Sequence, residues 1–127
     1  MNFDPVIPVI EHDPRIIAVY ALGSAVRDAL RPDSDIDLAL LLNPGASLST
    51  MERVALAARL SDVLSHPVDL GVLSAMNLVY TRQAVLSGRC IYRRPFALDA
   101  LLVANLLGLY ACFQEERQEV LNAYTAR

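Results

Sequence analysis

Acidic residues at alternating positions form the part of the sequence best suited to chemistry. Asp35 and Asp37 stand two positions apart, and Gly23 and Ser24 precede them with ten intervening residues, which gives the pattern G-S-x10-D-x-D. In an extended strand, residues two apart point to the same side at a separation of roughly 7 Å. We therefore expect both carboxylates to face one cleft, where a hard divalent cation such as Mg²⁺ offsets their charge and also binds substrate phosphates. The alternative, a pair of surface acids, leaves the apolar run at 38–42 without a coherent pattern.

A phosphate-binding loop and a third acid complete this candidate site. Gly23 lets a phosphate approach the backbone, and the Ser24 hydroxyl can donate to its oxygens together with the amides of a following helix. Arg27, one helical turn later, either reaches the triphosphate or forms a solvated ion pair with Asp28. Asp69 lies early in a later apolar segment, where it would bind the metal or help to deprotonate an attacking hydroxyl. The set predicts phosphoryl-type chemistry, in which a metal neutralises charge on a triphosphate.

The elements that must position these residues follow from apolar runs and their boundaries. The predicted strands span residues 16–22, 35–42, 68–73 and, as a short piece, 90–92. The predicted helices span residues 49–64, 74–86 and 96–123. Ser49 and Glu52 have capping-box spacing, and Gly88 is a helix stop. Strands alternating with helices predict one α+β domain over residues 1–127, a small mixed sheet flanked by helices.

The composition excludes several functional classes. The chain has 127 residues, 54% of them hydrophobic, and a formal net charge of −3, so neither global disorder nor a nucleic-acid substrate is expected. The apolar stretch 97–113 is interrupted by Asp99 and Asn105 and is shorter than the roughly 20 residues that span a bilayer. No membrane association and no signal peptide are expected, which predicts a cytoplasmic protein. Cys90 and Cys112 lack metal-ligand spacing and are predicted to be reduced core thiols.

The predicted terminal helix carries more apolar surface than the sheet requires. Val103 and Leu107 lie four positions apart beside the face that would cover the sheet. This surplus predicts a surface for a partner protein or for self-association into a homo-oligomer. The alternative is that the N-terminal segment 6–10 folds over the same surface.

The segment LGSAVRDALRPDSDIDLALLL resembles the signature of the minimal nucleotidyltransferases in the polymerase-beta-like superfamily. Members of this family are often encoded beside HEPN-domain toxins, and the order of the predicted elements follows the family over nearly the whole chain. The site residues that the resemblance implies are Gly23, Ser24 and Arg27 for the nucleotide, and Asp35, Asp37 and Asp69 for catalysis and metal binding.

The resemblance also implies an activity and a partner. Family members use ATP and one or two Mg²⁺ ions, and the antitoxin branch transfers AMP to a tyrosine of its HEPN-domain toxin. Two residues depart from the family pattern, because Val26 replaces a smaller residue and Asp28 replaces a glycine near the phosphate site. Two alternatives remain open. One is a noncatalytic antitoxin that acts by binding alone, and the other is a transferase for a small hydroxylated molecule such as an aminoglycoside.

Overall fold

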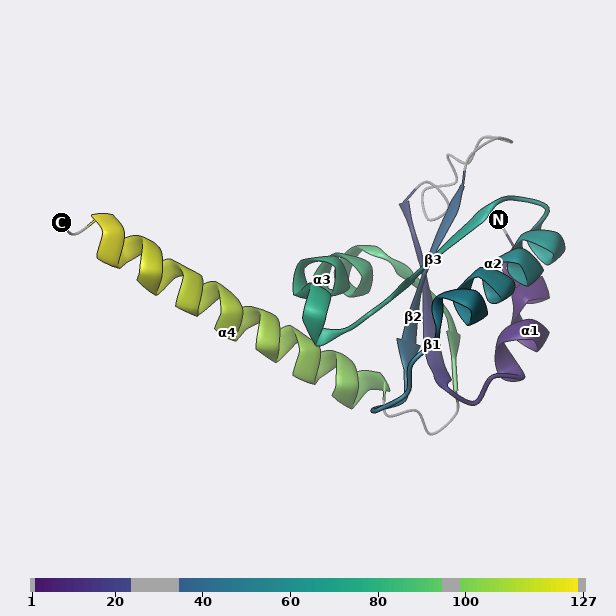
Figure 1. Cartoon of the computed structure of the whole chain (residues 1–127), viewed down its shortest axis with the longest axis horizontal. Coiled ribbons are helices and arrows are strands. Elements are labelled where there is room, and N and C mark those ends of the chain that lie inside the picture. The colour runs from purple at the N-terminus through teal and green to yellow at the C-terminus, as the bar shows by residue number, and fades with distance from the viewer. Residues whose placement is uncertain (1, 24–34, 95–98, 126–127) are drawn as a thin grey trace.

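The computed structural model describes residues 2–23, 35–94 and 99–125, without the side chains of residues 99–104, 113, 124 and 125. A four-stranded sheet lies in the centre, with helices on both faces (Figure 1). The strands are β1 (Ile16–Leu22), β2 (Ile36–Leu42), β3 (Val68–Val72) and β4 (Arg89–Arg93). The helices are η1 (Asp4–Val6), α1 (Ile7–Glu11), α2 (Thr50–Leu64), η3 (Ala75–Asn77), α3 (Leu78–Ser87) and α4 (Asp99–Thr125). The predicted α+β fold class is confirmed.

The strand order places the predicted acids beside one another. The sheet has the order β3-β2-β1-β4, with β1 antiparallel to both β2 and β4 and β2 parallel to β3. Leu22 at the end of β1 is paired with Asp37 near the start of β2, and Asp37 is paired with Asp69 near the start of β3. The end of β1 and the starts of β2 and β3 therefore meet at one end of the sheet.

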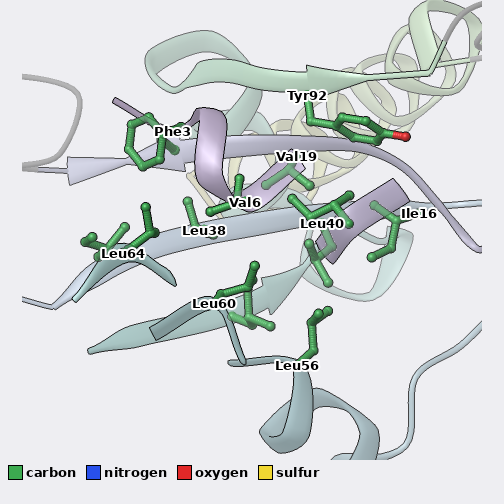
Figure 2. Packing of buried hydrophobic residues seen from close by; sticks show 14 of the residues in the cluster. Phe3, Val6, Ile16, Val19, Leu38, Leu40, Leu56, Leu60, Leu64 and Tyr92 are labelled. Atoms are coloured by element: carbon green, nitrogen blue, oxygen red, sulfur yellow. The ribbon is translucent and has the colours of Figure 1, made fainter. Parts of the chain in front are cut away.

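Apolar side chains cover both faces of the sheet, as the uninterrupted apolar runs predict. Figure 2 shows the core between the strands and the helices α1 and α2. Its labelled members are Phe3, Val6, Ile16, Val19, Leu38, Leu40, Leu56, Leu60, Leu64 and Tyr92. The core on the opposite face consists of Ala18, Tyr20, Ala39, Leu41, Leu73 and Ala84. Burial on two faces gives β1 and β2 a fixed register, which in turn fixes the positions of the acids.

Helix α2 begins and ends where the sequence predicts. The Ser49 hydroxyl accepts a hydrogen bond from the Glu52 amide at 3.1 Å, and the Glu52 carboxylate accepts one from the Ser49 amide at 3.0 Å. Buried leucines at four-residue spacing direct one face of the helix toward the sheet. Ser65, in the left-handed region with φ 57°, ends the helix ahead of β3.

The segment between β3 and β4 differs in detail from its prediction. One helix was expected over residues 74–86, but a 3-10 turn, η3, precedes α3. Helix α3 ends at Gly88, as predicted, and packs closely on β1. A Cβ atom at Gly88 would lie 2.7 Å from Leu22 Cδ2 and 3.0 Å from the Ala21 carbonyl oxygen. The glycine therefore permits close approach of the helix end to the strand.

Helix α4 packs against α3 near its beginning and then projects far beyond the sheet (Figure 1). Arg82 of α3 lies over the Tyr110 ring, 5.3 Å from its centroid. The side chains at positions 115–123 are exposed. The N-terminal helix α1 packs on the opposite face with α2, so the idea that the N-terminal segment covers the terminal helix is wrong. No helix in the described part of the chain has the length and apolar character needed to cross a bilayer.

The prediction that the cysteines are core thiols is also wrong. Cys90 and Cys112 are both free and exposed. Cys90 lies on β4, which forms an edge of the sheet, and Cys112 lies on the projecting α4.

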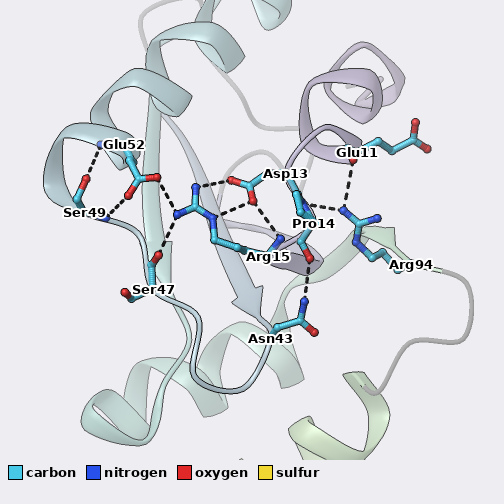
Figure 3. A network of polar contacts seen from close by, with 9 residues as sticks. All are labelled: Glu11, Asp13, Pro14, Arg15, Asn43, Ser47, Ser49, Glu52 and Arg94. Carbon is cyan, nitrogen blue, oxygen red and sulfur yellow. Dashed lines mark hydrogen bonds and ion pairs between the residues drawn. The ribbon is translucent and has the colours of Figure 1, made fainter.

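A network of charged side chains joins the N-terminal segment to the fold at the end of the sheet where β1 begins (Figure 3). Arg15 donates to Asp13 through Nε at 2.9 Å and Nη2 at 2.8 Å, and its Nη1 lies 2.7 Å from Glu52 Oε2. Arg94 donates to the carbonyl oxygens of Ile16 and Asp13, each at 2.7 Å. These contacts hold together segments from four parts of the chain.

Candidate active site

A cavity of about 700 Å³ begins at the end of the sheet where β1 ends and β2 and β3 begin, and it extends along β3 to Val72. This volume is within the range of small-molecule and cofactor sites. The cavity is lined by Leu22, Gly23, Asp37, Arg53, Asp69, Leu70, Gly71, Val72, Asn77, Tyr80, Gln83 and Ser87. It thus brings together three of the predicted site residues, one from the end of β1 and one each from β2 and β3.

The carboxylates of Asp37 and Asp69 share one environment because the two residues are paired in the parallel β2–β3 ladder. Burial raises the pKa of Asp37 above its ordinary value, and the negative charges of Asp69 and Asp35 raise it further. The ion pairs found in the described part of the chain join Arg15 to Asp13 and Glu52, at the other end of the sheet. Asp37 therefore carries a charge that its described surroundings disfavour.

Asp35 lies just before β2 and is exposed. It is not part of the cavity lining, but its charge reaches Asp37, as its effect on the pKa of that carboxyl shows. The cavity lining therefore contains Asp37 and Asp69 but not Asp35.

Gly23 closes the β1 side of the cavity in a conformation that favours glycine. Its φ is +65°, in the left-handed region, where a side chain costs roughly 1 kcal/mol or more. A Cβ atom there would lie 3.6 Å from Asp37 Oδ2, which is an ordinary contact distance. The backbone of Gly23 is thus directly beside the Asp37 carboxylate. Ser24 and Arg27, the other predicted nucleotide ligands, lie outside the described residues.

The carboxylate pair fits a magnesium ion in its ligand chemistry. Within residues 2–23, 35–94 and 99–125, no group of three or more His, Cys, Asp or Glu side chains is arranged to hold a metal. Magnesium is commonly held by only one or two carboxylates, with substrate phosphates and water as its other ligands. Asp37 and Asp69 supply two such oxygens, and a cation there would offset the repulsion that raises the pKa of Asp37.

Tyr80 of α3 is a cavity residue that the sequence analysis missed. Its ring packs on Gly71 so closely that a Cβ atom at Gly71 would lie 2.8 Å from Tyr80 Cζ. Burial raises the pKa of Tyr80, and the negative charges of Asp37 and Asp69 raise it further. Gly71, inside the strand predicted at residues 68–73, was the one sequence signal for this contact, because a glycine within a strand often marks the close approach of another group.

Arg53 of α2 was missed as well, although it provides a cation in the lining of this cavity. It lies on the first turn of α2 and is exposed. The lining of the cavity therefore includes a cation as well as the two carboxylates. No local sequence pattern distinguishes Arg53 from other exposed arginines on helices.

Comparison with known proteins places this geometry in a family. The Polymerase beta, Nucleotidyltransferase family model matches residues 5–96, which include the sheet and the cavity. A curated relative, the protein adenylyltransferase MntA of Shewanella oneidensis, is 27% identical over 123 residues, covering 96% of this chain and 86% of the relative.

Two solved structures share the fold over more than nine tenths of their own chain and of this one. One is a toxin-antitoxin with AMP-PNP, with TM-score 0.79, 26% identity and coverage of 98% of this chain and 99% of the other. The second is a tri-AMPylated Shewanella oneidensis HEPN toxin in complex with MNT antitoxin, with TM-score 0.69, 26% identity and coverage of 94% and 92%. The resemblance seen in the sequence is confirmed, and this chain belongs to the Polymerase beta, Nucleotidyltransferase family.

Proposed function

We propose that this protein transfers AMP from ATP to a hydroxyl of a HEPN-type toxin, its partner, and thereby acts as an antitoxin. The observation that carries the proposal is the pairing of Asp37 with Asp69 beside the left-handed Gly23, inside one cavity. Two relatives support the choice of reaction and partner, namely the protein adenylyltransferase MntA and the antitoxin in complex with an AMPylated HEPN toxin.

The proposed roles of the described residues follow from their positions. Asp37 and Asp69 would hold Mg²⁺, with Asp35 adding negative charge that acts on Asp37. When bound, Mg²⁺ neutralises charge that develops on the phosphates during transfer. Gly23 leaves its backbone accessible to a phosphate, because no side chain projects there. Ser24 and Arg27 would add phosphate contacts from the segment that follows Gly23.

The transfer joins the acceptor oxygen to the α-phosphorus of ATP and releases pyrophosphate. Asp69 would accept the proton of the acceptor hydroxyl, and its position in the cavity, paired with Asp37 across the β2–β3 ladder, supports this role. Arg53 is a cation in the same lining and would interact with phosphate oxygens. Catalysis then rests on positioning and on electrostatic stabilisation of the transition state, as is usual for phosphoryl-type transfer.

The experiment mixes the purified protein with Mg²⁺, the HEPN-type toxin from the neighbouring gene and ATP labelled on its α-phosphate. The expected result is label on the toxin, none from ATP labelled on the γ-phosphate, and loss of toxin activity. The double variant Asp35→Asn/Asp37→Asn should lose transfer by orders of magnitude. Asp62→Asn, which removes an exposed acid from α2, is the matched control and should retain it.

Two outcomes would contradict the proposal. Neutralisation of the toxin without label would identify an antitoxin that acts by binding alone. Transfer by the double variant at the parent rate would show that these acids are not the site.

A further inference from the structure

The cavity contains a phenol of this chain beside the proposed acids. Tyr80 lines the same cavity as Asp37 and Asp69, and it reaches this position from α3, which covers one face of the sheet. Its charge environment includes both carboxylates. A nucleotide bound at the acids would therefore have a hydroxyl of the protein itself as a neighbour.

The position of this hydroxyl is fixed by packing. The ring end of Tyr80 lies on the backbone of Gly71, where even a methyl group would come within 2.8 Å of Cζ. Gly71 follows Asp69 by two positions on β3, so both face the same side of the sheet at a spacing of roughly 7 Å along the strand. Asp37 is level with Asp69 on the adjacent strand. The Tyr80 hydroxyl is thus held over the same side of the sheet as both acids, at the position two residues along β3 from Asp69.

Neighbouring hydroxyls are engaged elsewhere, whereas no hydrogen bond of Tyr80 is found among the described residues. Thr81 Oγ1 donates to the Ser74 carbonyl oxygen at 3.1 Å, and Ser74 Oγ donates to Asn77 Oδ1 at 2.9 Å. Ser87 also lines the cavity but lies at the last residue of α3, away from the Gly71 position. A half-buried phenol that lines the same cavity as two carboxylates, and that has no hydrogen-bond partner in residues 2–23, 35–94 and 99–125, is a candidate for a group that reacts with the substrate.

We propose that Tyr80 is an internal acceptor and that the protein adenylylates itself there. This inference rests on the proposed nucleotidyl transfer. The Tyr80 oxygen forms a bond to the α-phosphorus of ATP, and the bond between that phosphorus and the α,β-bridging oxygen breaks. Pyrophosphate leaves, and the phenol proton passes to the Asp69 carboxylate and then to water. Nothing is oxidised or reduced, and ATP is the only co-reactant.

The modification would limit the activity of the protein itself. AMP linked to Tyr80 occupies the cavity that the next ATP must enter, since the residue lines that cavity. The partner hydroxyl and Tyr80 therefore compete for the same nucleotide. Without a partner, the chain would convert to an adenylylated form that no longer turns over.

The experiment incubates the wild-type protein with Mg²⁺ and ATP in the absence of partner, followed by intact mass and peptide mapping. We expect one AMP per chain, carried by the tryptic peptide 60–82, in which Tyr80 is the sole tyrosine. The rate constant should not change when the protein is diluted, because the transfer is intramolecular. An ATP analogue with a methylene group between the α- and β-phosphates should give no product, because the bond that must break is absent.

Two phenylalanine variants locate the acceptor. Tyr80→Phe keeps the ring that packs on Gly71 and should abolish incorporation. Tyr110→Phe is the matched control, because Tyr110 lies on α4 against Arg82 and is not in the cavity lining, and it should incorporate AMP as the parent does.

The failure of this inference is distinguishable from failure of the proposed function. A parallel reaction with the HEPN-type toxin reports transfer to the partner. Label on the toxin with none on the chain overturns self-adenylylation and leaves the proposed function standing. Label on the chain at a residue other than Tyr80, or incorporation that persists in Tyr80→Phe, also overturns the inference. Absence of label from both proteins contradicts the proposed function and the inference together.

Discussion

The carboxylates at the two ends of the sheet have pKa values shifted in opposite directions. At the end where β1 begins, Asp13 and Glu52 both contact Arg15, and hydrogen bonds from Arg15 hold the pKa of Asp13 below its ordinary value (Figure 3). At the end where β1 stops, burial and the charges of Asp69 and Asp35 raise the pKa of Asp37. The first end uses its charges to hold the fold together. The second accumulates negative charge that a ligand must offset.

This difference separates structural from functional charge in one small protein. A paired carboxylate stabilises the folded state, whereas an uncompensated one costs stability that is recovered when a cation binds. Active sites commonly carry such a cost. Substitutions at the two ends should consequently have opposite effects on stability and separate effects on activity.

The largest expected effect is on AMP transfer, from substitutions at the end of the sheet where Asp37 and Asp69 lie. Asp37→Asn or Asp69→Asn removes a carboxylate from the proposed metal site and should reduce transfer by roughly a hundredfold or more. Asp13→Asn changes an acid of the network instead, and its transfer rate should equal that of the parent. Rates measured with labelled ATP and partner check this. Equal losses from Asp13→Asn and Asp37→Asn would remove the distinction between the two ends.

A smaller effect is expected at the glycine beside Asp37. Gly23→Ala introduces a side chain where a phosphate would approach, and ATP affinity should fall by roughly tenfold, or about 1.4 kcal/mol. Gly45→Ala is a matched control, because Gly45 also has a left-handed φ, of +79°, but a Cβ atom there meets nothing within 4 Å. Both variants carry similar backbone strain, so calorimetric titration isolates the site effect. Equal affinities for the two variants would count against the phosphate-binding role.

Removal of Arg15, the cation that contacts both Asp13 and Glu52, should affect stability and leave AMP transfer unchanged. Arg15→Ala loses the contacts to Asp13 and Glu52, and the midpoint of thermal unfolding should fall by a few degrees. Arg59→Ala, an exposed arginine on α2, is the control and should change the midpoint little. Transfer by both variants should match the parent. A transfer defect in Arg15→Ala with an unchanged midpoint would show that the network serves the site.

The smallest effect is a difference in pH dependence. Asp13 and Glu52 have lowered pKa values, so the stability they contribute is present above their ordinary pKa and is lost as the pH falls below about 4. Asp37 has a raised pKa, so the folded state binds its proton more readily and stability rises as the pH falls through that value. Urea unfolding of the parent and of Asp37→Asn between neutral and acidic pH checks this. The variant should lack the rise, and an identical rise in both would assign it to another group.

The sequence predicted the local elements well because they depend on local patterns. The β1 segment is a continuous apolar run, and the start of α2 carries the Ser49 and Glu52 pattern that forms the observed capping box. The positions of Cys90 and Cys112 were mispredicted, because an apolar segment does not reveal which of its residues lies on a sheet edge or on a projecting helix. Burial at those positions depends on which other elements pack against β4 and α4, and the sequence near the cysteines does not show this.

The candidate site was only partly predictable for the same reason. The D-x-D spacing places Asp35 and Asp37 together, but the pairing of Asp37 with Asp69 depends on a parallel ladder between strands separated by α2. Tyr80 and Arg53 enter the cavity from two different helices, and only tertiary packing brings them there. Residues close in sequence could be grouped from their spacing, whereas those contributed by distant segments required the fold.

We infer that Asp37 and Asp69, near the starts of β2 and β3, form a metal and nucleotide site at the expense of stability. Thermal unfolding of the parent and Asp37→Asn tests it directly, with and without Mg²⁺ and an ATP analogue that carries a methylene group between its α- and β-phosphates. Without ligand, Asp37→Asn should unfold at a higher temperature than the parent, because the raised pKa of Asp37 marks an unfavourable charge. With ligand, the parent should gain stability and the variant should not. A variant that unfolds at a lower temperature without ligand, yet gains as much from the analogue as the parent does, would contradict the account.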